Sequence, residues 1–271
     1  MAVSIHTSVL LSETIDLIAV TAAGIYVDAT VGLGGHSEAI LDQDADARLI
    51  AIDQDAEALA IACEGLSRFK DRVTLVQANF ADLKQVLRDQ GTPKVDGLIA
   101  DLGVSSLQFD SQSRGFSFRF DAPLDMRMDA GSDEPNAADL LATLSKDEIA
   151  NIIYLYGEER FSRRIARRIV EKREHGEPIT TTKQLVEIVE RSVRRSPKDK
   201  IHPATRTFQA LRIAVNHEVE ILERFVLDAV DSLKIGGVFA VITFHSLEDR
   251  IAKQTFQRLS GKCFCPPRMP V

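Results

Sequence analysis

Four short β-branched runs alternate with helix-like segments over the first hundred residues, and this alternation limits the fold more than any other feature. The runs are Ile25–Val31, Arg48–Asp53, Val73–Ala78 and Val95–Val104, and Gly91 closes the last of the helix-like segments between them. Strands that alternate with helices usually pair in parallel and are covered on both faces. The sequence therefore predicts an α/β fold with a mostly parallel sheet and helices on both faces.

The alternation stops after the fourth run and resumes only near the end of the chain. Residues 105–135 are rich in Gly, Ser and Asp, and four helix-like segments follow. Two of these begin with capping-box patterns, Ser145 with Glu148 and Thr181 with Gln184. A long helix (216–233), a strand (236–245) and a last helix then restore the rhythm. We expect residues 1–105 and 203–271 to form one α/β domain and residues 106–202 to be a helical insertion.

Composition excludes several classes of protein. The 271 residues are 45% hydrophobic and 27% charged, which is ordinary for a globular chain. No run of about 18 apolar residues occurs, and the N-terminus lacks the basic start of a signal peptide. The three cysteines, Cys63, Cys263 and Cys265, do not suggest a disulfide framework, so a reducing cytoplasm is the expected compartment.

Charge is distributed unevenly along the chain. The formal net charge of -7 argues against a non-specific nucleic-acid coat. Residues 158–200 nevertheless contain 13 Lys+Arg and 8 Asp+Glu. A basic segment within an acidic chain can still meet a phosphate backbone locally.

A glycine cluster follows the first predicted strand and indicates a ligand site. Gly32, Gly34 and Gly35 allow a close backbone approach, and the helix start after them offers free N–H groups. Asp53, at the end of the second strand, could accept both hydroxyls of a ribose. NAD and S-adenosylmethionine (SAM) both suit this arrangement, but Ser37 stands at the third-glycine position of a dinucleotide site, which favours SAM. A glycine-rich turn that binds nothing is the remaining alternative.

Two further strand ends carry candidate ligand contacts. Phe80 follows the third strand, where it could stack on an adenine ring or belong to the core. Asp101 ends the fourth strand, within reach of a transferred group. Ligands of open α/β sheets bind at the carboxyl ends of the strands, so these positions support the same site.

Several blocks of the sequence together resemble the ribosomal RNA small-subunit methyltransferase H family. The resemblance extends from His6 to Arg250, with the blocks in the same order. They are HTSVLL, DATVGLGGHS, AIDQD, DLGVSSLQ, RGFSF, PLDMRMD, YGEERFSRRIARRIV, HPATRTFQALRIAVN and FHSLEDR.

The resemblance implies a Rossmann-like, SAM-dependent methyltransferase fold and methylation of the exocyclic N4 of one cytidine, cytosine-1402, in 16S rRNA. The partner is then the small ribosomal subunit, with no membrane involved, and a homodimer is compatible with it. Family members usually continue further, with more cysteines, a basic segment and the last strands, so this chain looks short at its C-terminus. The implied cofactor contacts are Gly34, Gly35, His36, Asp53, Phe80, Asp101 and Gln108.

The cytosine amine is a poor nucleophile, so the enzyme must place it in line with the methyl group and accept its proton. Base aminomethyltransferases often carry an (Asn/Asp/Ser)-Pro-Pro-aromatic motif at the end of the fourth strand, whereas Asp101-Leu-Gly-Val stands here. We expect Asp101 or a neighbouring carbonyl to accept the N4 hydrogen bond. Contact between Asp101 and SAM alone is the alternative.

Substrate contacts are expected mainly in the insertion. Phe116 and Phe118 could form a stacking wall or lid for a base that leaves its stack, although their alternation with Phe120 also suits a short strand with one buried face. Arginines on the flanks of an apolar helical stripe could contact phosphate or remain solvated. The tentative substrate contacts are Phe116, Phe118, Arg164, Arg168, Arg206, His245 and Ser246.

Two alternatives to a methyltransferase stay open at this point. One is an NAD-dependent oxidoreductase, and the other is a non-catalytic RNA-binding or assembly factor. Ser246 could instead cap the last helix, with Asp249 at its third position. Cys263 and Cys265 form only half of a zinc-like pattern, so no metal is expected.

Overall fold

The computed structural model describes residues 8–69, 71–193 and 201–261, and the chain forms two compact units. The sheet unit comprises residues 1–103 and 219–271, and the helical unit comprises residues 104–218. The first boundary thus lies close to the expected one, but the second lies at residue 218 rather than 202. Cys263 and Cys265 lie outside the described residues.

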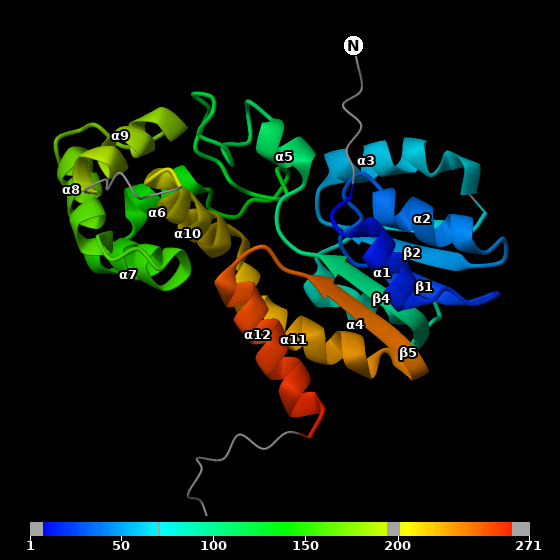
Figure 1. Ribbon diagram of the computed structural model, residues 1–271. Coiled ribbons are helices and arrows are strands. Elements are labelled where there is room, and N and C mark those ends of the chain that lie inside the picture. Colours follow the sequence, from blue (N-terminus) through cyan, green and yellow to red (C-terminus); the bar gives the residue numbers. More distant parts are fainter. Residues whose placement is uncertain (1–7, 70, 194–200, 262–271) are drawn as a thin grey trace, which may run out of the picture. The chain divides into compact units, whose positions relative to one another are not determined.

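The sheet unit contains five parallel strands in the order β3-β2-β1-β4-β5 (Figure 1). Their bounds are β1 Ile25–Asp28, β2 Arg48–Asp53, β3 Val73–Gln77, β4 Val95–Asp101 and β5 Leu233–Ile242. The order reverses at β1, which lies between β2 and β4. This is the expected Rossmann-like α/β fold, although β5 begins and ends three residues before the predicted strand.

Alternate strand residues point to opposite sides of the sheet, and helices pack on the apolar residues of both faces. Tyr26, Leu49 and Ile99 pack on one side in a cluster with residues of α1, α2 and α3. Val27 and Leu98 pack on the other side with residues of α4 and α11. The helix bounds are α1 Leu11–Ile18, α2 Gly35–Gln43, α3 Ala56–Gly65, α4 Leu83–Asp89, α11 Glu218–Asp231 and α12 Ser246–Leu259. Helix α1 was not predicted, since its N-terminus has no side-chain cap.

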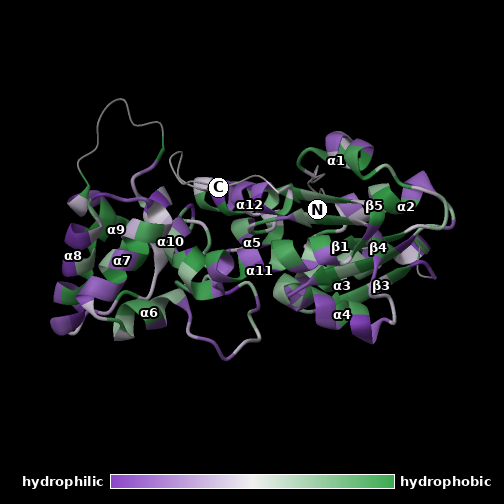
Figure 2. Ribbon diagram, turned by 90° about the horizontal axis from the view of Figure 1, so that it is seen from below, coloured by the Kyte–Doolittle hydropathy of each residue, from purple (hydrophilic) through white to green (hydrophobic). Residues whose placement is uncertain are grey.

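The helical unit packs amphipathic helices around its own core. Its helices are α5 Ser106–Asp110, α6 Ala137–Thr143, α7 Lys146–Gly157, α8 Ser162–Glu174, α9 Thr182–Ser192 and α10 Ala204–Asn216. Figure 2 shows hydrophobic and hydrophilic residues alternating along these helices. The predicted capping boxes of Ser145 with Glu148 and of Thr181 with Gln184 are both present. No helix in the described part of the chain is long and apolar enough to cross a membrane.

Helix α10 explains why the second boundary lies later than expected. The side chain of its last residue, Asn216, donates to the carbonyl of Met126 at 2.8 Å and accepts from the Met128 backbone at 2.7 Å. Phe208 and Leu211 of the same helix are buried in the core of the helical unit. The helix therefore belongs to the insertion, although its sequence is contiguous with the returning α/β part.

Phe225 offers a test of the core beneath the sheet. This residue of α11 is fully buried and contacts the rings of Phe80 and Phe239, with centroids 4.8 and 5.7 Å away. Phe225→Ala should lower the free energy of unfolding by about 3–5 kcal/mol, because it leaves a cavity. Urea unfolding measures the change, with Leu17→Ala, at a position 64% exposed, as the control. Equal effects of the two substitutions would contradict the packing described here.

Candidate active site

Three carboxylates lie at the same edge of the sheet because parallel strands end there together. Asp28 ends β1, Asp53 ends β2 and Asp101 ends β4, on neighbouring strands (Figure 1). The turn between β1 and α2 starts from this edge. Since β1 is where the strand order reverses, this is the position at which open α/β sheets bind ligands.

The glycine turn is fixed by backbone bonds and by one carboxylate. Gly34 has φ of 89°, in the left-handed region that favours glycine, and its N–H donates to the Val31 carbonyl at 2.7 Å. Asp53 accepts from the Gly32 N–H at 2.8 Å and from the Asp55 N–H at 2.9 Å. The acid that sequence reasoning placed beside the turn therefore holds the turn directly.

Asp28 is a site residue that sequence reasoning missed. It is 1% exposed, accepts a hydrogen bond from Ser37 Oγ at 2.7 Å and accepts another from the Thr30 N–H at 3.2 Å. Burial raises the pKa of its carboxyl to about 6 despite these bonds. Ser37 occupies the third-glycine position of a dinucleotide motif, so its contact with Asp28 gives that departure a structural reason. Asp28 could have been found from the sequence, because it is an aspartate at the end of a β-branched strand.

Asp101 has the most unusual environment of the three. Its backbone N–H donates to Thr30 Oγ1 at 2.7 Å, yet its Oδ1 is buried and has no hydrogen-bond partner among the described residues. Burial, followed by the charges of Asp28 and Glu248, raises the pKa of the Asp101 carboxyl to about 7. A carboxylate that gains and loses a proton near neutral pH suits proton transfer.

His36 lies next to this carboxylate, in the first turn of α2. Its Nε2 is 3.1 Å from the carbonyl oxygen of Val9, and its Nδ1 is 3.9 Å from Asp101 Oδ2. The ring is buried, at 6% exposed. His36 thus anchors the N-terminal segment to the turn and faces the acid, which is a supporting position rather than an open ligand surface.

The other two expected cofactor contacts are engaged within their own units. Phe80 is partly buried and packs on Phe225, as its core interpretation predicted. Gln108, in the helical unit, is 4% exposed, and its carboxamide closes the capping box of α5 with Ser105 and donates to the Met128 carbonyl at 3.4 Å. Its contact with a cofactor stays a prediction.

The phenylalanines of RGFSFRF do not form the expected strand. Phe116 is 6% exposed within the core of the helical unit, so a role in stacking on a base is not supported. Phe118 is partly buried against the rings of His202 and Phe208, with centroids 4.7 and 5.1 Å away. Gly115 has φ of 72°, which breaks the extended conformation here. Only glycine fits at this position, because a side chain would meet the Pro123 carbonyl.

The expected arginine contacts lie on the surface of the helical unit. Arg164 and Arg168 are partly exposed on α8, while Ile165 and Ile169 of the same helix are buried. Arg206 is exposed on α10. Their contact with phosphate stays a prediction. Arg212, by contrast, forms two hydrogen bonds with Glu218, at 2.9 and 2.8 Å, and has a structural role.

At the start of α12 the expected cap is wrong. His245, not Ser246, is the N-cap, and its Nδ1 accepts from the Glu248 N–H at 3.4 Å. Imidazole carries a ring nitrogen that can accept this bond, so the histidine replaces the usual hydroxyl. Its Nε2 lies 3.0 Å from Glu248 Oε1, and the side chain is 7% exposed. Ser246 is exposed in the first turn of the helix.

The fold and the site together define a Rossmann-like enzyme domain that binds a nucleoside-containing ligand. The glycine turn, the carboxylate at the end of β2 and the titratable acid at the end of β4 surround one point of the sheet edge. The third glycine of a dinucleotide-binding motif is absent, because Ser37 stands at its position.

Comparison with known proteins identifies the family. Residues 3–271 match the model of the MraW methylase family, and the chain belongs to this family. Proteins named ribosomal RNA small subunit methyltransferase H from Geotalea uraniireducens and Trichlorobacter lovleyi are each 51% identical over 267 residues, which cover 98% of this chain and 85% of theirs. The one from Brevibacillus brevis is 49% identical over 268 residues, with the same coverage. The oxidoreductase alternative is thereby excluded.

The raised pKa of Asp101 predicts how stability depends on pH. The unfolded chain ionises this carboxyl near 3.8 and the folded chain near 7. Between these values the folded state holds more protons, so stability falls as pH rises. Asp101→Asn removes this titration, and its gain in Tm over wild type should be small at about pH 4 and reach several degrees at about pH 8. Thermal unfolding at both values measures the difference, and a gain independent of pH would reject the assignment.

Proposed function

We propose that this chain transfers a methyl group from SAM to the exocyclic N4 of one cytidine, cytosine-1402, in 16S rRNA of the small ribosomal subunit. Membership of a methylase family and the names of its relatives support the reaction class and the RNA. The observation that carries the chemistry is the buried, unpartnered Oδ1 of Asp101 among the described residues, next to the glycine turn.

The residues at the sheet edge fit SAM. Asp53 still has lone pairs for ribose hydroxyls after accepting from Gly32 and Asp55, because a carboxylate accepts about four hydrogen bonds. Helix α2 begins at Gly35, and the first turn of a helix offers backbone N–H groups without intrahelical partners to an approaching ligand. When bound, SAM supplies an electrophilic methyl group on its sulfonium.

Asp101 performs the part of the reaction that the protein must supply. As N4 of cytosine attacks, positive charge develops on the amine and a proton must leave. The ionised Asp101 carboxylate accepts a hydrogen bond from that amine, which orients it and stabilises the developing charge. Burial, helped by the charges of Asp28 and Glu248, raises the pKa of Asp101 to about 7, so a considerable fraction is ionised at pH 7 and can be protonated during turnover.

The helical unit would recognise the RNA. Its exposed or partly exposed cations include Arg164, Arg168 and Arg206, and Phe118 keeps part of its ring accessible. Phosphate contacts fix the position of an RNA, whereas stacking on an unpaired base selects the nucleotide. His245 and Ser246, at the end of the sheet unit, complete the proposed substrate contacts.

Asp101→Asn should reduce the turnover number about 10²–10⁴-fold, because an amide is a poor proton acceptor. The wild-type rate should rise with pH through about 7, where Asp101 ionises. Glu248→Gln should move the midpoint of this profile to lower pH, since it removes a charge that raises the pKa of Asp101. Single-turnover methylation of small subunits over a range of pH measures all three. A midpoint that does not respond to Glu248→Gln rejects the role of Asp101, even if turnover falls.

Asp53→Asn should weaken SAM binding at least tenfold without unfolding the chain, because the amide nitrogen cannot accept from a ribose hydroxyl or from Gly32. Calorimetry with SAM measures the affinity, and NAD serves as the ligand expected not to bind. Unchanged SAM affinity would place the nucleoside elsewhere.

Mass spectrometry of 16S rRNA from a strain that lacks this gene tests the reaction itself. The expected result is the loss of one methyl group on cytosine-1402, restored by the wild-type chain and not by Asp101→Asn. Loss of a methyl group from C5 or from the ribose would reject N4 as the acceptor. No change in methylation would leave only the non-catalytic alternative.

A further inference from the structure

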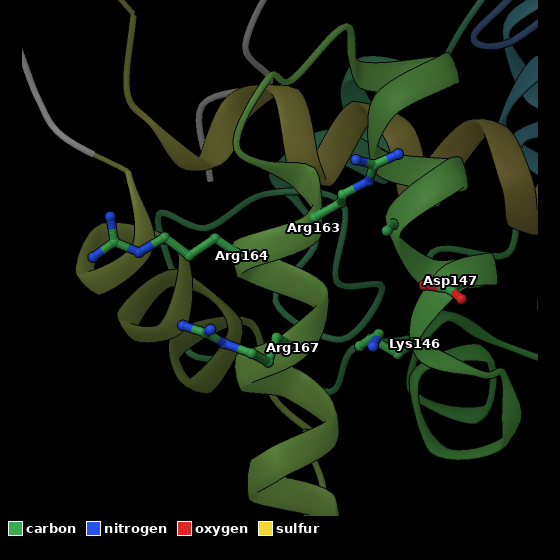
Figure 3. A pocket seen from close by; sticks show the side chains of 6 residues that line it. Lys146, Asp147, Arg163, Arg164 and Arg167 are labelled. Atoms are coloured by element: carbon green, nitrogen blue, oxygen red, sulfur yellow. The ribbon is translucent and has the colours of Figure 1, made fainter.

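A hollow formed by residues of α7 and α8 is lined mainly by cations. It has a volume of about 450 Å³ and is lined by Lys146, Asp147, Ala150, Arg163, Arg164 and Arg167. Figure 3 shows Lys146 and Asp147 at the start of α7 and the three arginines along α8. Four cations and one carboxylate therefore line it, a balance that favours an anionic ligand.

These arginines occupy unfavourable positions for the helix that carries them. Arg163 and Arg164 lie in the first turn of α8, which contains no acidic residue. The N-terminus of a helix carries partial positive charge and stabilises acids rather than bases. A local choice that opposes helix stability without a compensating contact is typical of a functional position.

The structure provides little internal neutralisation for this charge. Among the described residues, no carboxylate lies within 4.0 Å of Arg163 or Arg164, and Arg167 has only a loose contact with Glu171, at 3.5 Å between two exposed side chains. Glu148, the other acid in the first turn of α7, accepts from the Ser145 N–H in its capping box at 2.8 Å. Asp147 is thus the one acid that lines the hollow in the described part of the helical unit.

The arrangement of the cations indicates an extended ligand. In Figure 3 the Arg163 side chain reaches toward α7, whereas Arg164 and Arg167 extend on the other side of α8. A single bound anion would be held by donors that converge on it, but these donors diverge. Spread cations on a helix surface match successive phosphates along a strand.

We propose that Lys146, Arg163 and Arg167 form a docking surface for the RNA backbone, on which consecutive phosphates of single-stranded rRNA bind across the hollow. This inference rests on the proposed function and identifies how the helical unit holds its substrate. Lys146 was not among the expected substrate contacts, whereas Arg163 and Arg167 belong to the flanking arginines for which phosphate contact was one of two expectations. Asp147 limits the affinity, so the surface binds RNA without holding it too tightly for release.

The test measures RNA binding separately from methyl transfer. The probe is a fluorescein-labelled RNA oligonucleotide that spans cytosine-1402, titrated with the full chain at several KCl concentrations. Arg163→Ser with Arg167→Ser should raise Kd about 10–100-fold at low salt and reduce the slope of log K against log salt by about 1.4, from about 0.7 per lost phosphate contact. Asp147→Asn should lower Kd. Arg191→Ser, at an exposed arginine of α9 outside the hollow, is the matched control and should leave both quantities unchanged.

Two further measurements keep the outcomes distinct. Arg163→Lys with Arg167→Lys preserves charge and should retain most of the affinity, which excludes a folding defect as the cause. Wild-type Kd and slope in the serine double variant, or an Asp147→Asn chain that does not bind more tightly, overturn the inference. SAM affinity and methylation are measured on the same preparations. If RNA binding falls as expected while the wild-type chain methylates no cytidine N4, the docking surface stands and the proposed function fails.

Discussion

The hydrogen bond between Ser37 and the buried Asp28 is the interaction on which the candidate site depends. It ties the end of β1 to the first turn of α2 and thereby sets the path of the glycine turn between them. Thr30, two residues after Asp28, then accepts the Asp101 N–H and connects this turn to β4. Asp53 holds the same turn from the other side. The ends of β1, β2 and β4 are therefore connected through one turn, with Asp28 buried at its start.

Burying carboxylates at the sheet edge lowers the stability of the fold, but it also raises their pKa values towards neutrality. Burial raises the pKa of both the Asp28 and the Asp101 carboxyl, and the charge of Asp28 adds to the rise at Asp101. A core residue of similar size would stabilise the fold more, but it could not accept a proton near neutral pH. The helical unit shows the same conflict at the first turn of α8, where arginines occupy positions that favour acids. In both units, a departure from local stability coincides with residues for which we propose a functional role.

Much of the fold could be predicted from the sequence, because periodicity and capping are local signals. The strands β1 to β4 and helices α6 to α9 follow from them, as does Asp101 at a strand end. The second boundary could not be predicted, since α10 belongs to the insertion through long-range contacts, such as the packing of Phe208 and the bonds of Asn216 to a loop about 90 residues earlier. Whether Phe116 is buried or exposed could not be predicted for a related reason. A buried and an exposed phenylalanine cannot be told apart in the sequence, because long-range packing decides which one is buried. The cap of α12 was also missed, since His245 caps this helix where the hydroxyl of Ser246 was expected.

The helical unit is inserted between two strands that are neighbours in the sheet, and this has a consequence for folding. Val95 of β4 pairs with Leu233 of β5, although residues 104–218 separate them along the chain. Closing so long a loop costs conformational entropy, whereas the contacts within the insertion are comparatively local. An insertion that collapses first replaces a long flexible loop by a compact body, and the fifth strand then docks at a lower entropic cost. The connectivity thus favours an order of assembly in which the helical unit forms before the sheet is completed.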